Sequence, residues 1–279
     1  MNRRSFLKTG LAAASFAGFG LSRFAYADNS KKIPLALQVY SVREEAAKDL
    51  AGTLKKIAAI GYTGVEFAGY YGHSAADVRK MLDDAGLVAV STHLGVAPLL
   101  GDAFYQTVDF EKTLGNKTLM VAGGIGPACC FDAGNQMTAH LFNEISIKAE
   151  KVGMRIGFHA HGGDFTDING TTAWDLFFSR TRPEVIAQMD VGNTLAAGAD
   201  PYAAIEKFPG RGKLIHVKSN PGHAAVAASD DEVDWKRVID LCTNVAGTEW
   251  YIIEQEGGPE GVPVMDMCRK SYENFTALI

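Results

Sequence analysis

The sequence predicts an α/β fold, a closed barrel of eight parallel strands in which a helix follows each strand. Eight short apolar runs alternate with stretches of helical spacing, and such alternation specifies parallel strands joined by right-handed crossovers. About 250 residues follow the first 27, which matches a (β/α)8 barrel in size. An open doubly wound sheet is the competing fold, but the first expected turn, Tyr40-Ser41-Val42-Arg43, lacks the glycines typical of such sheets.

Four strand and helix pairs are expected in the first half of the barrel. The strands are predicted at 33–39, 64–67, 87–91 and 118–121, and the helices at 44–60, 74–85, 108–114 and 135–152. Leu50, Leu54 and Ile57 show the helical spacing in the first helix. Ser74 is placed to cap the second helix, and Gly86 follows its end.

Four further pairs are expected in the second half, and their strands end in ionisable side chains. The strands are predicted at 155–158, 185–189, 214–215 and 250–253, with helices near 172–180, 201–208, 234–245 and 265–278. After Asp190, Gly192 and the small residues that follow indicate a loop. The strand ends in this half carry His159-Ala160-His161, Asp190, His216-Val217-Lys218 and Glu254-Gln255-Glu256.

The carboxyl ends of barrel strands meet around one mouth, so residues far apart in sequence come together there. Any single polar residue at a strand end has a structural explanation, but histidines and carboxylates are more numerous here than stability alone requires. We therefore predict one divalent-metal site built by the last four strands. The polar residues expected at the mouth are Gln38, Tyr40, Glu66, His93, His159, His161, Asp190, Asn193, His216, Lys218, Glu254 and Glu256.

Composition bounds the class of protein. Of the 279 residues, 47% are hydrophobic and 21% charged, and the formal net charge is −5, as in a soluble globular protein of one large domain. The acidic balance argues against a nucleic acid as the main partner, because phosphate contacts need clustered Lys and Arg. The four cysteines include no Cys-x-x-Cys pair and are interpreted as small buried side chains.

The amino terminus resembles a twin-arginine signal peptide. Arg3-Arg4-Ser5-Phe6-Leu7-Lys8 precedes an apolar run from 11 to 21, and Ala25-Tyr26-Ala27 ends it with small residues. An ordinary secretory signal or an uncleaved anchor is the alternative. The expected organisation is a signal at 1–27 and one barrel domain at 28–279, exported to the periplasm by the twin-arginine translocation machinery. Export in the folded state implies that the metal is acquired in the cytoplasm.

Several motifs in order resemble the sugar phosphate isomerase/epimerase family, which shares a xylose-isomerase-like barrel. The resemblance extends from Leu35 to about Tyr272 and implies a small-molecule carbohydrate substrate. The family also covers inosose dehydratases, zinc AP endonucleases and lyases of 3-keto-glycosides. The motifs are Leu37-Gln38-Val39-Tyr40-Ser41-Val42-Arg43, Ile60-Gly61-Tyr62-Thr63-Gly64-Val65-Glu66, Met189-Asp190-Val191-Gly192-Asn193 with Ala197-Gly198-Ala199-Asp200-Pro201, Ile215-His216-Val217-Lys218 and Ile253-Glu254-Gln255.

The resemblance implies that Asp190, His216 and Glu254 are metal ligands. Ketose epimerases of the family place a glutamate at the end of the fifth strand, where this chain has His159-Ala160-His161. Side chains two apart on a strand share a face, so either imidazole can reach the ion; we interpret His159 as the fourth ligand, with His161 and Glu66 as alternatives. Ligands without thiolate favour manganese or zinc, with cobalt and iron as further options.

This site predicts a sugar or keto-sugar isomerase or epimerase that acts through an enediolate. The candidate bases are Glu254, His161 and Glu66, and Lys218 is expected to hold the developing oxyanion. Metal-dependent β-elimination on 3-keto-glycosides and a non-catalytic carbohydrate-binding barrel are the alternatives, and a homo-oligomer is left open. An AP endonuclease is disfavoured because Asn193 stands where those enzymes have a histidine. Candidates for gripping substrate hydroxyls are Gln38, Tyr40, His93 and Asn193.

Overall fold

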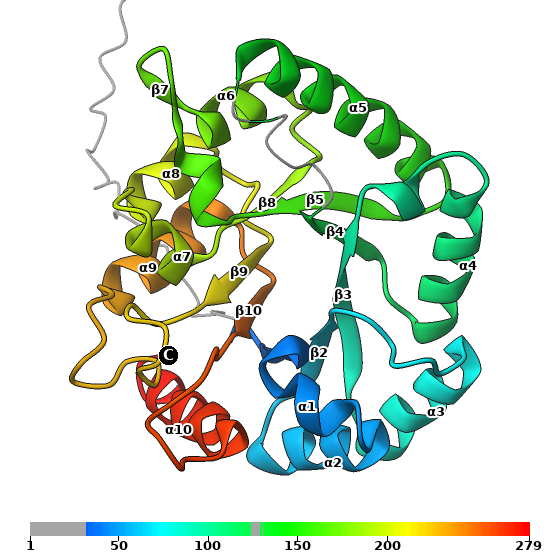
Figure 1. Cartoon of the computed structure of the whole chain (residues 1–279), viewed down its shortest axis with the longest axis vertical. Helices are drawn as coiled ribbons and strands as arrows, with labels where there is room; N and C mark the ends of the chain where they lie inside the picture. Colours follow the sequence, from blue (N-terminus) through cyan, green and yellow to red (C-terminus); the bar gives the residue numbers. More distant parts are fainter. Residues whose placement is uncertain (1–31, 124–128, 130) are drawn as a thin grey trace, which may run out of the picture. The chain divides into compact units, whose positions relative to one another are not determined.

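Strands and helices alternate along the part of the chain that the computed structural model describes, which is residues 32–123, 129 and 131–279. In Figure 1 the strands form a ring and the helices lie outside it. The predicted signal segment at 1–27 lies outside the described residues. Within the described ranges, no helix combines the length and the apolar character needed to cross a membrane.

Eight parallel strands form the barrel. Their order around the ring is β8-β5-β4-β3-β2-β1-β10-β9, and the ring is closed where the His216 amide donates to the carbonyl of Met189 at 2.9 Å, beside a parallel bridge between Asp190 and His216. The predicted barrel is confirmed. The strands are β1 (Leu35–Gln38), β2 (Gly64–Phe67), β3 (Val88–Gly95), β4 (Thr118–Gly123), β5 (Arg155–His159), β8 (Ile186–Gln188), β9 (Leu214–Val217) and β10 (Trp250–Ile253).

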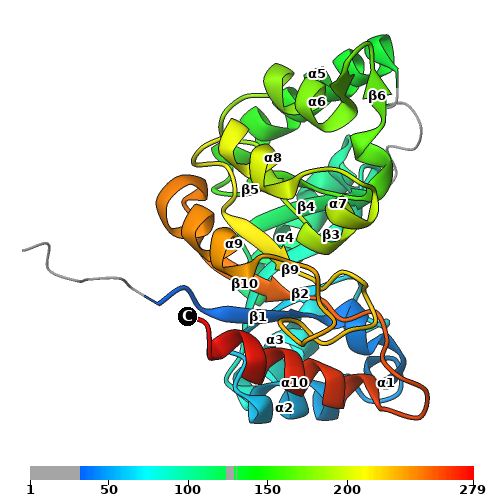
Figure 2. The same cartoon turned by 90° about the vertical axis from the view of Figure 1, so that its left-hand side faces the viewer.

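The helices cover the outside of the ring. The last helix, α10, lies beside α2 in Figures 1 and 2, and the hydroxyl of Tyr272 donates to the carbonyl of Gly61 at 3.1 Å. This contact joins the last helix to the first strand-and-helix unit of the barrel. The helices are α1 (Arg43–Ala46), α2 (Leu50–Ile60), α3 (Ala75–Ala85), α4 (Ala103–Leu114), α5 (Asp132–Lys151), α6 (Ala173–Arg180), α7 (Val191–Ala196), α8 (Pro201–Lys207), α9 (Trp235–Leu241) and α10 (Val264–Thr276).

Three local features differ from the prediction. The helix expected at 44–60 is two helices, because the Asp49 side chain accepts the Gly52 amide and starts α2 there. The expected loop after Asp190 is wrong: Asp190 accepts the Asn193 amide at 2.8 Å and thereby caps the short helix α7. A two-stranded hairpin of β6 (Asp167–Ile168) and β7 (Thr171–Thr172) precedes α6 and was not predicted.

The inside of the barrel has an apolar layer below a polar one. Side chains two apart on a strand share a face. On or directly after β1, β8, β9 and β10, the polar residues two positions beyond this layer therefore also point inward: Gln38, Gln188, His216 and Glu254. On β5 the inward position is Gly157, where a Cβ would lie 2.6 Å from the Met120 sulfur. The apolar layer consists of Ala36, Val90, Met120, Ile186, Leu214 and Ile252.

Candidate active site

A cavity of about 420 Å³ opens above the polar layer, at the carboxyl ends of the strands. This is the end of a barrel at which function is expected. Its volume is sufficient for a small molecule of sugar size. The ionisable and polar residues in its wall are Tyr40, His93, His159, His161, Asn193, Glu254 and Glu256.

Four residues at the base of this cavity form a cluster that can hold a metal ion. His159 and Glu254 belong to the cavity wall, whereas Asp190 and His216 do not. His159, Asp190, His216 and Glu254 each offer one ligand atom, and these atoms lie within 4.8 Å of one another. All four side chains are buried. They come from the ends of the fifth to eighth barrel strands in chain order, so the barrel brings together the residues proposed as ligands from the sequence.

The polar atoms of this cluster fit a cation. The Asp190 Oδ2 atom is buried and accepts no hydrogen bond, although His159 Nε2 and His216 Nδ1 lie 3.9 Å from it and Lys218 Nζ 4.0 Å. A buried carboxylate oxygen without a donor is costly. Burial accordingly raises the pKa of Asp190 to about 7, against the opposing charge of Lys218. A divalent cation bound between these groups would satisfy that oxygen.

His216 is held between two carboxylates. Its Nδ1 lies 2.7 Å from Glu254 Oε2, and its Nε2 lies 2.6 Å from Glu66 Oε1. Burial alone would lower the pKa of His216, but Glu66 and Glu254 raise it to about 10. Burial would likewise raise the pKa of Glu254, but the hydrogen bond and charge of His216 lower it to about 2. A carboxylate such as Glu66, which accepts a hydrogen bond from one imidazole nitrogen, orients the ring so that it can bind a metal.

Glu66 lies at the centre of the polar layer. Its Oε1 accepts from Gln38 Nε2 at 2.8 Å and its Oε2 from Gln188 Nε2 at 2.8 Å and from Ser91. Burial would raise the pKa of Glu66, but His93 and His216 lower it well below its usual value. Gln38 also accepts the Tyr40 amide at 3.0 Å. Neither Gln38 nor Glu66 is in the cavity wall, so the structure places both beneath it.

Two residues of this network were missed in the sequence. Gln188 contacts three of the site residues. Its Nε2 donates to Glu66, and its Oε1 lies 2.9 Å from His93 Nε2 and 3.0 Å from His159 Nδ1. Ser91 donates to Glu66. The signal that identifies them is strand periodicity, because Gln188 precedes Asp190 by two positions and Ser91 precedes His93 by two.

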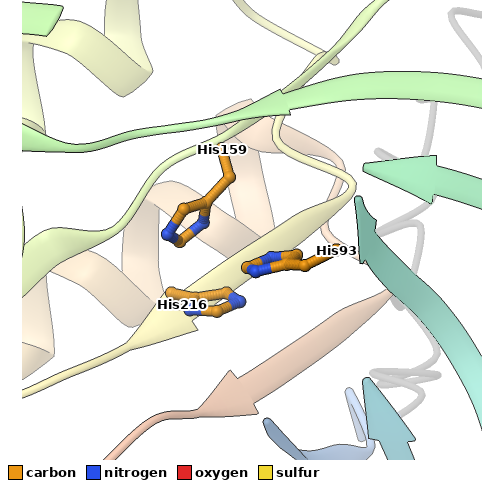
Figure 3. Close-up of side chains that lie close together, drawn as sticks. All are labelled: His93, His159 and His216. Carbon is orange, nitrogen blue, oxygen red and sulfur yellow. The ribbon is translucent and has the colours of Figure 1, made fainter. Parts of the chain in front are cut away.

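Three imidazoles face one another in the middle of the barrel, as Figure 3 shows. The rings of His93 and His216 are stacked with centroids 5.2 Å apart, and His159 lies 4.4 Å from each of them. Their nitrogens form a second group of potential ligands that shares His159 and His216 with the first. Burial lowers the pKa of His159 well below its usual value, and the charges of the neighbouring histidines act in the same direction.

The remaining predicted residues lie around the mouth. His161 and Tyr40 are exposed in the cavity wall, with 43% of Tyr40 accessible, and burial of part of the His161 ring lowers its pKa. Lys218 is buried, and its Nζ donates to Asn193 Oδ1 at 2.8 Å and lies 2.9 Å from Glu256. Burial would lower the pKa of Lys218, but Asp190 and the two nearby glutamates raise it, so the side chain remains a cation.

The Asp190-Val191-Gly192-Asn193 motif has a local structural reason. Asp190 uses Oδ1 to cap α7, which leaves Oδ2 directed at the histidines. Gly192 lies so close to the end of β9 that a Cβ would stand 2.5 Å from the Ser219 carbonyl oxygen. Asn193 donates to the Ala160 carbonyl at 3.2 Å and ties the ends of β5 and β8 together.

Comparison with known proteins gives the family. Residues 54–270 match the model described as "Xylose isomerase-like TIM barrel". The chain belongs to this family. A solved structure similar to this chain is a sugar phosphate isomerase/epimerase from Parabacteroides distasonis, with 25% identity, a TM-score of 0.76 and coverage of 86% of this chain and 96% of that one. The resemblance found in the sequence is confirmed at this level.

Curated proteins similar to this chain have other names. The "Rhizopine catabolism protein MocC" of Rhizobium meliloti is 21% identical over 267 residues, which cover 81% of this chain and 80% of the relative. An "Inosose dehydratase" of Bacillus cereus is 21% identical over 245 residues, covering 74% of this chain and 82% of the relative. The proteins to which this chain is similar therefore include a sugar phosphate isomerase/epimerase and an inosose dehydratase.

Proposed function

We propose that this protein is a divalent-metal-dependent isomerase or epimerase of a sugar or keto-sugar. The proposal rests on one observation above all, the buried cluster of His159, Asp190, His216 and Glu254 with an unsatisfied oxygen on Asp190, directly below a sugar-sized cavity. Its ligands are imidazoles and carboxylates without thiolate, a set that suits manganese or zinc, with cobalt and iron as alternatives.

In this proposal His159, Asp190, His216 and Glu254 hold the ion. An ion held there would supply Lewis acidity to a carbonyl of the substrate and so favour loss of a proton from the neighbouring carbon. Glu66 accepts from Nε2 of His216 at 2.6 Å and so orients the ring, with Nδ1 facing Glu254 and Asp190. Both oxygens of Glu66 accept hydrogen bonds from residues of the polar layer. We therefore assign it a positioning role rather than the role of the base.

His161 is the residue best placed to move the substrate proton. It is exposed in the cavity wall, and its lowered pKa keeps the imidazole neutral near pH 7. Glu254 also lines the cavity, but in this proposal its carboxylate is used to hold the ion. Lys218, a cation beside Asn193, contributes positive charge near the substrate oxygens. Tyr40, His93 and Asn193 are in the wall and can hydrogen-bond substrate hydroxyls.

Elimination is the second candidate reaction. Two observations favour it: His159 occupies the strand end at which the resemblance expects a glutamate, and the curated relatives include inosose dehydratases. With a single base such as His161, the proton removed from carbon can be delivered to a β-oxygen that leaves. The substrate class is then a keto-sugar or 3-keto-glycoside.

Solvent exchange distinguishes these possibilities. The protein is stripped of metal, reloaded with manganese or zinc, and incubated in D₂O with ketohexoses, inosose and 3-keto-glycosides, and the products are read by NMR. Deuterium next to the carbonyl with retained oxygen content identifies an isomerase or epimerase, whereas an unsaturated ketone identifies a lyase. Binding without exchange in any loaded form would leave a carbohydrate-binding barrel and reject the enzymatic proposal.

We also propose export of the protein through the twin-arginine pathway. The support is the paired arginines Arg3 and Arg4 ahead of the apolar run and the small residues up to Ala27. Replacing both arginines by lysine is expected to leave the protein in the cytoplasm, as measured by fractionation. Unchanged periplasmic content of that variant would point to the ordinary secretory route.

A further inference from the structure

A second cavity adjoins the candidate active site. It has a volume of about 350 Å³ and lies beyond the carboxyl ends of β2 and β3, against α4, which Figure 1 shows outside β3. His93 and Leu94 belong to the walls of both cavities. The two are therefore neighbours at the mouth of the barrel.

The wall of this second cavity is mainly apolar and aromatic. The rings of Tyr70 and Phe110 lie 4.5 Å apart in a tilted arrangement, and Leu94 and Pro98 complete the apolar surface. This wall presents flat apolar faces, which suit a ring better than a flexible chain.

The buried polar atoms next to this wall are used within the protein. The Tyr70 hydroxyl lies 2.6 Å from Glu111 Oε1 and donates to it, and the hydroxyl of Thr92 lies 3.0 Å from that of Tyr70. Asn116 donates to the other Glu111 oxygen at 2.8 Å. A sugar ring would need hydrogen-bonding partners that these atoms no longer offer, so the chemistry favours an apolar occupant.

We propose, resting on the proposed function, that this second cavity is a subsite for an aromatic ring carried by the sugar substrate. A cavity of about 150 Å³ is enough to hold benzene, so the volume here accommodates a phenyl ring with its linking atom. A sugar bound above the metal cluster would direct one substituent past His93 and Leu94 into it. The substrate class is then an aryl-substituted keto-sugar.

The test compares methyl and phenyl glycosides of one 3-keto-sugar on the metal-loaded protein. The dissociation constant is measured by calorimetry, and exchange in D₂O is followed separately by NMR. The phenyl compound is expected to bind about tenfold more tightly, because its ring leaves water for an apolar wall. Equal binding of the two compounds would overturn the subsite. Absence of exchange with both compounds would count against the proposed function instead.

Two variants on α4 test whether the phenyl ring binds in the second cavity. Gln106 lines the second cavity and Asp109 does not, although both are exposed on the same helix. Gln106→Trp is expected to fill the cavity, abolish the advantage of the phenyl compound and leave binding of the methyl compound unchanged. Asp109→Trp is expected to retain the advantage. If Gln106→Trp weakens both compounds equally, or if both variants behave alike, the ring does not bind here.

Discussion

Replacing Asp190 by asparagine is expected to stabilise the metal-free protein while abolishing tight metal binding. The carboxylate is fully buried, and its Oδ2 accepts no hydrogen bond. Asparagine keeps an oxygen for the Asn193 amide that caps α7, and its neutral amide costs less to bury than a charge. If Asp190 were needed only for the fold, its replacement would lower the free energy of unfolding of the metal-free protein instead.

The magnitude follows from the pKa of Asp190, which burial raises from 3.8 to about 7 against the charge of Lys218. One pKa unit corresponds to about 1.4 kcal/mol, so the penalty above pH 7 has an upper limit of about 4 kcal/mol. That limit already includes the attraction of Lys218, 4.0 Å away. Burying the neutral amide of asparagine costs part of it, and we expect a net gain of about 1–3 kcal/mol at pH 8. A folded-state pKa above the unfolded one means that this gain declines as the pH falls from 7 and is absent below about 4.

The assay is urea unfolding in the presence of a chelator at pH 8 and at acidic pH, together with metal affinity by competition with a chromophoric chelator. Metal affinity is expected to fall by about 100-fold or more, because a ligand is lost. Asp200→Asn is the matched control: Asp200 caps α8 through Oδ1, but it is exposed and away from the cluster. A metal-free Asp190→Asn protein that is less stable than the parent at pH 8, or that keeps its metal affinity, would refute this reasoning.

Three further outcomes test the roles of neighbouring residues. Glu66→Gln is expected to weaken metal binding by about 10–100-fold in the chelator competition, since His216 loses the carboxylate that orients it. Glu111 is a buried carboxylate outside the cluster, and Glu111→Gln should leave the metal affinity unchanged. Equal effects of the two substitutions would contradict the positioning role of Glu66. His161→Gln is expected to slow deuterium exchange by about 100-fold or more at full metal content, as measured by NMR and metal analysis; an unchanged rate would exclude His161 as the base. Asp164→Asn is expected to raise the free energy of unfolding by about 1–2 kcal/mol at pH 8, because burial raises the pKa of Asp164 to about 6 and so penalises its charged form. In thermal melts this gain in stability should vanish near pH 4. A gain that persists at that pH would show another cause.

Much of the barrel was predictable because its signals are local. The strands Gly64–Phe67 and Trp250–Ile253 have the predicted bounds, and Ser74 caps α3 as expected. Short-range chemistry also explains two of the errors. The cap by Asp49 that divides the first helical region and the cap by Asp190 that starts α7 depend on where a carboxylate points, which apolar periodicity does not report.

The candidate ligands were predictable because each follows directly after an apolar run, and a closed barrel gathers such positions at one mouth. The roles of Glu66 and Gln38 were not predictable. Both are strand-end polar residues in the sequence, yet the structure places them below the cavity, where neighbouring strands supply enough donors to occupy Glu66. Which strand-end residues face substrate depends on register between strands, which no single segment encodes.

The sequence by itself determined the alternation of strands and helices, and with it the closed barrel and the collection of histidines and carboxylates at its mouth. Only the tertiary structure decided that Asp190 keeps one oxygen unsatisfied, that His216 is shared between Glu66 and Glu254, and that an aromatic cavity adjoins the site. The physical reason is the distance along the chain between the residues that interact. Apolar periodicity acts within one segment, whereas a ligand set and a pocket arise from contacts between residues such as Glu66 and His216 that lie 150 positions apart.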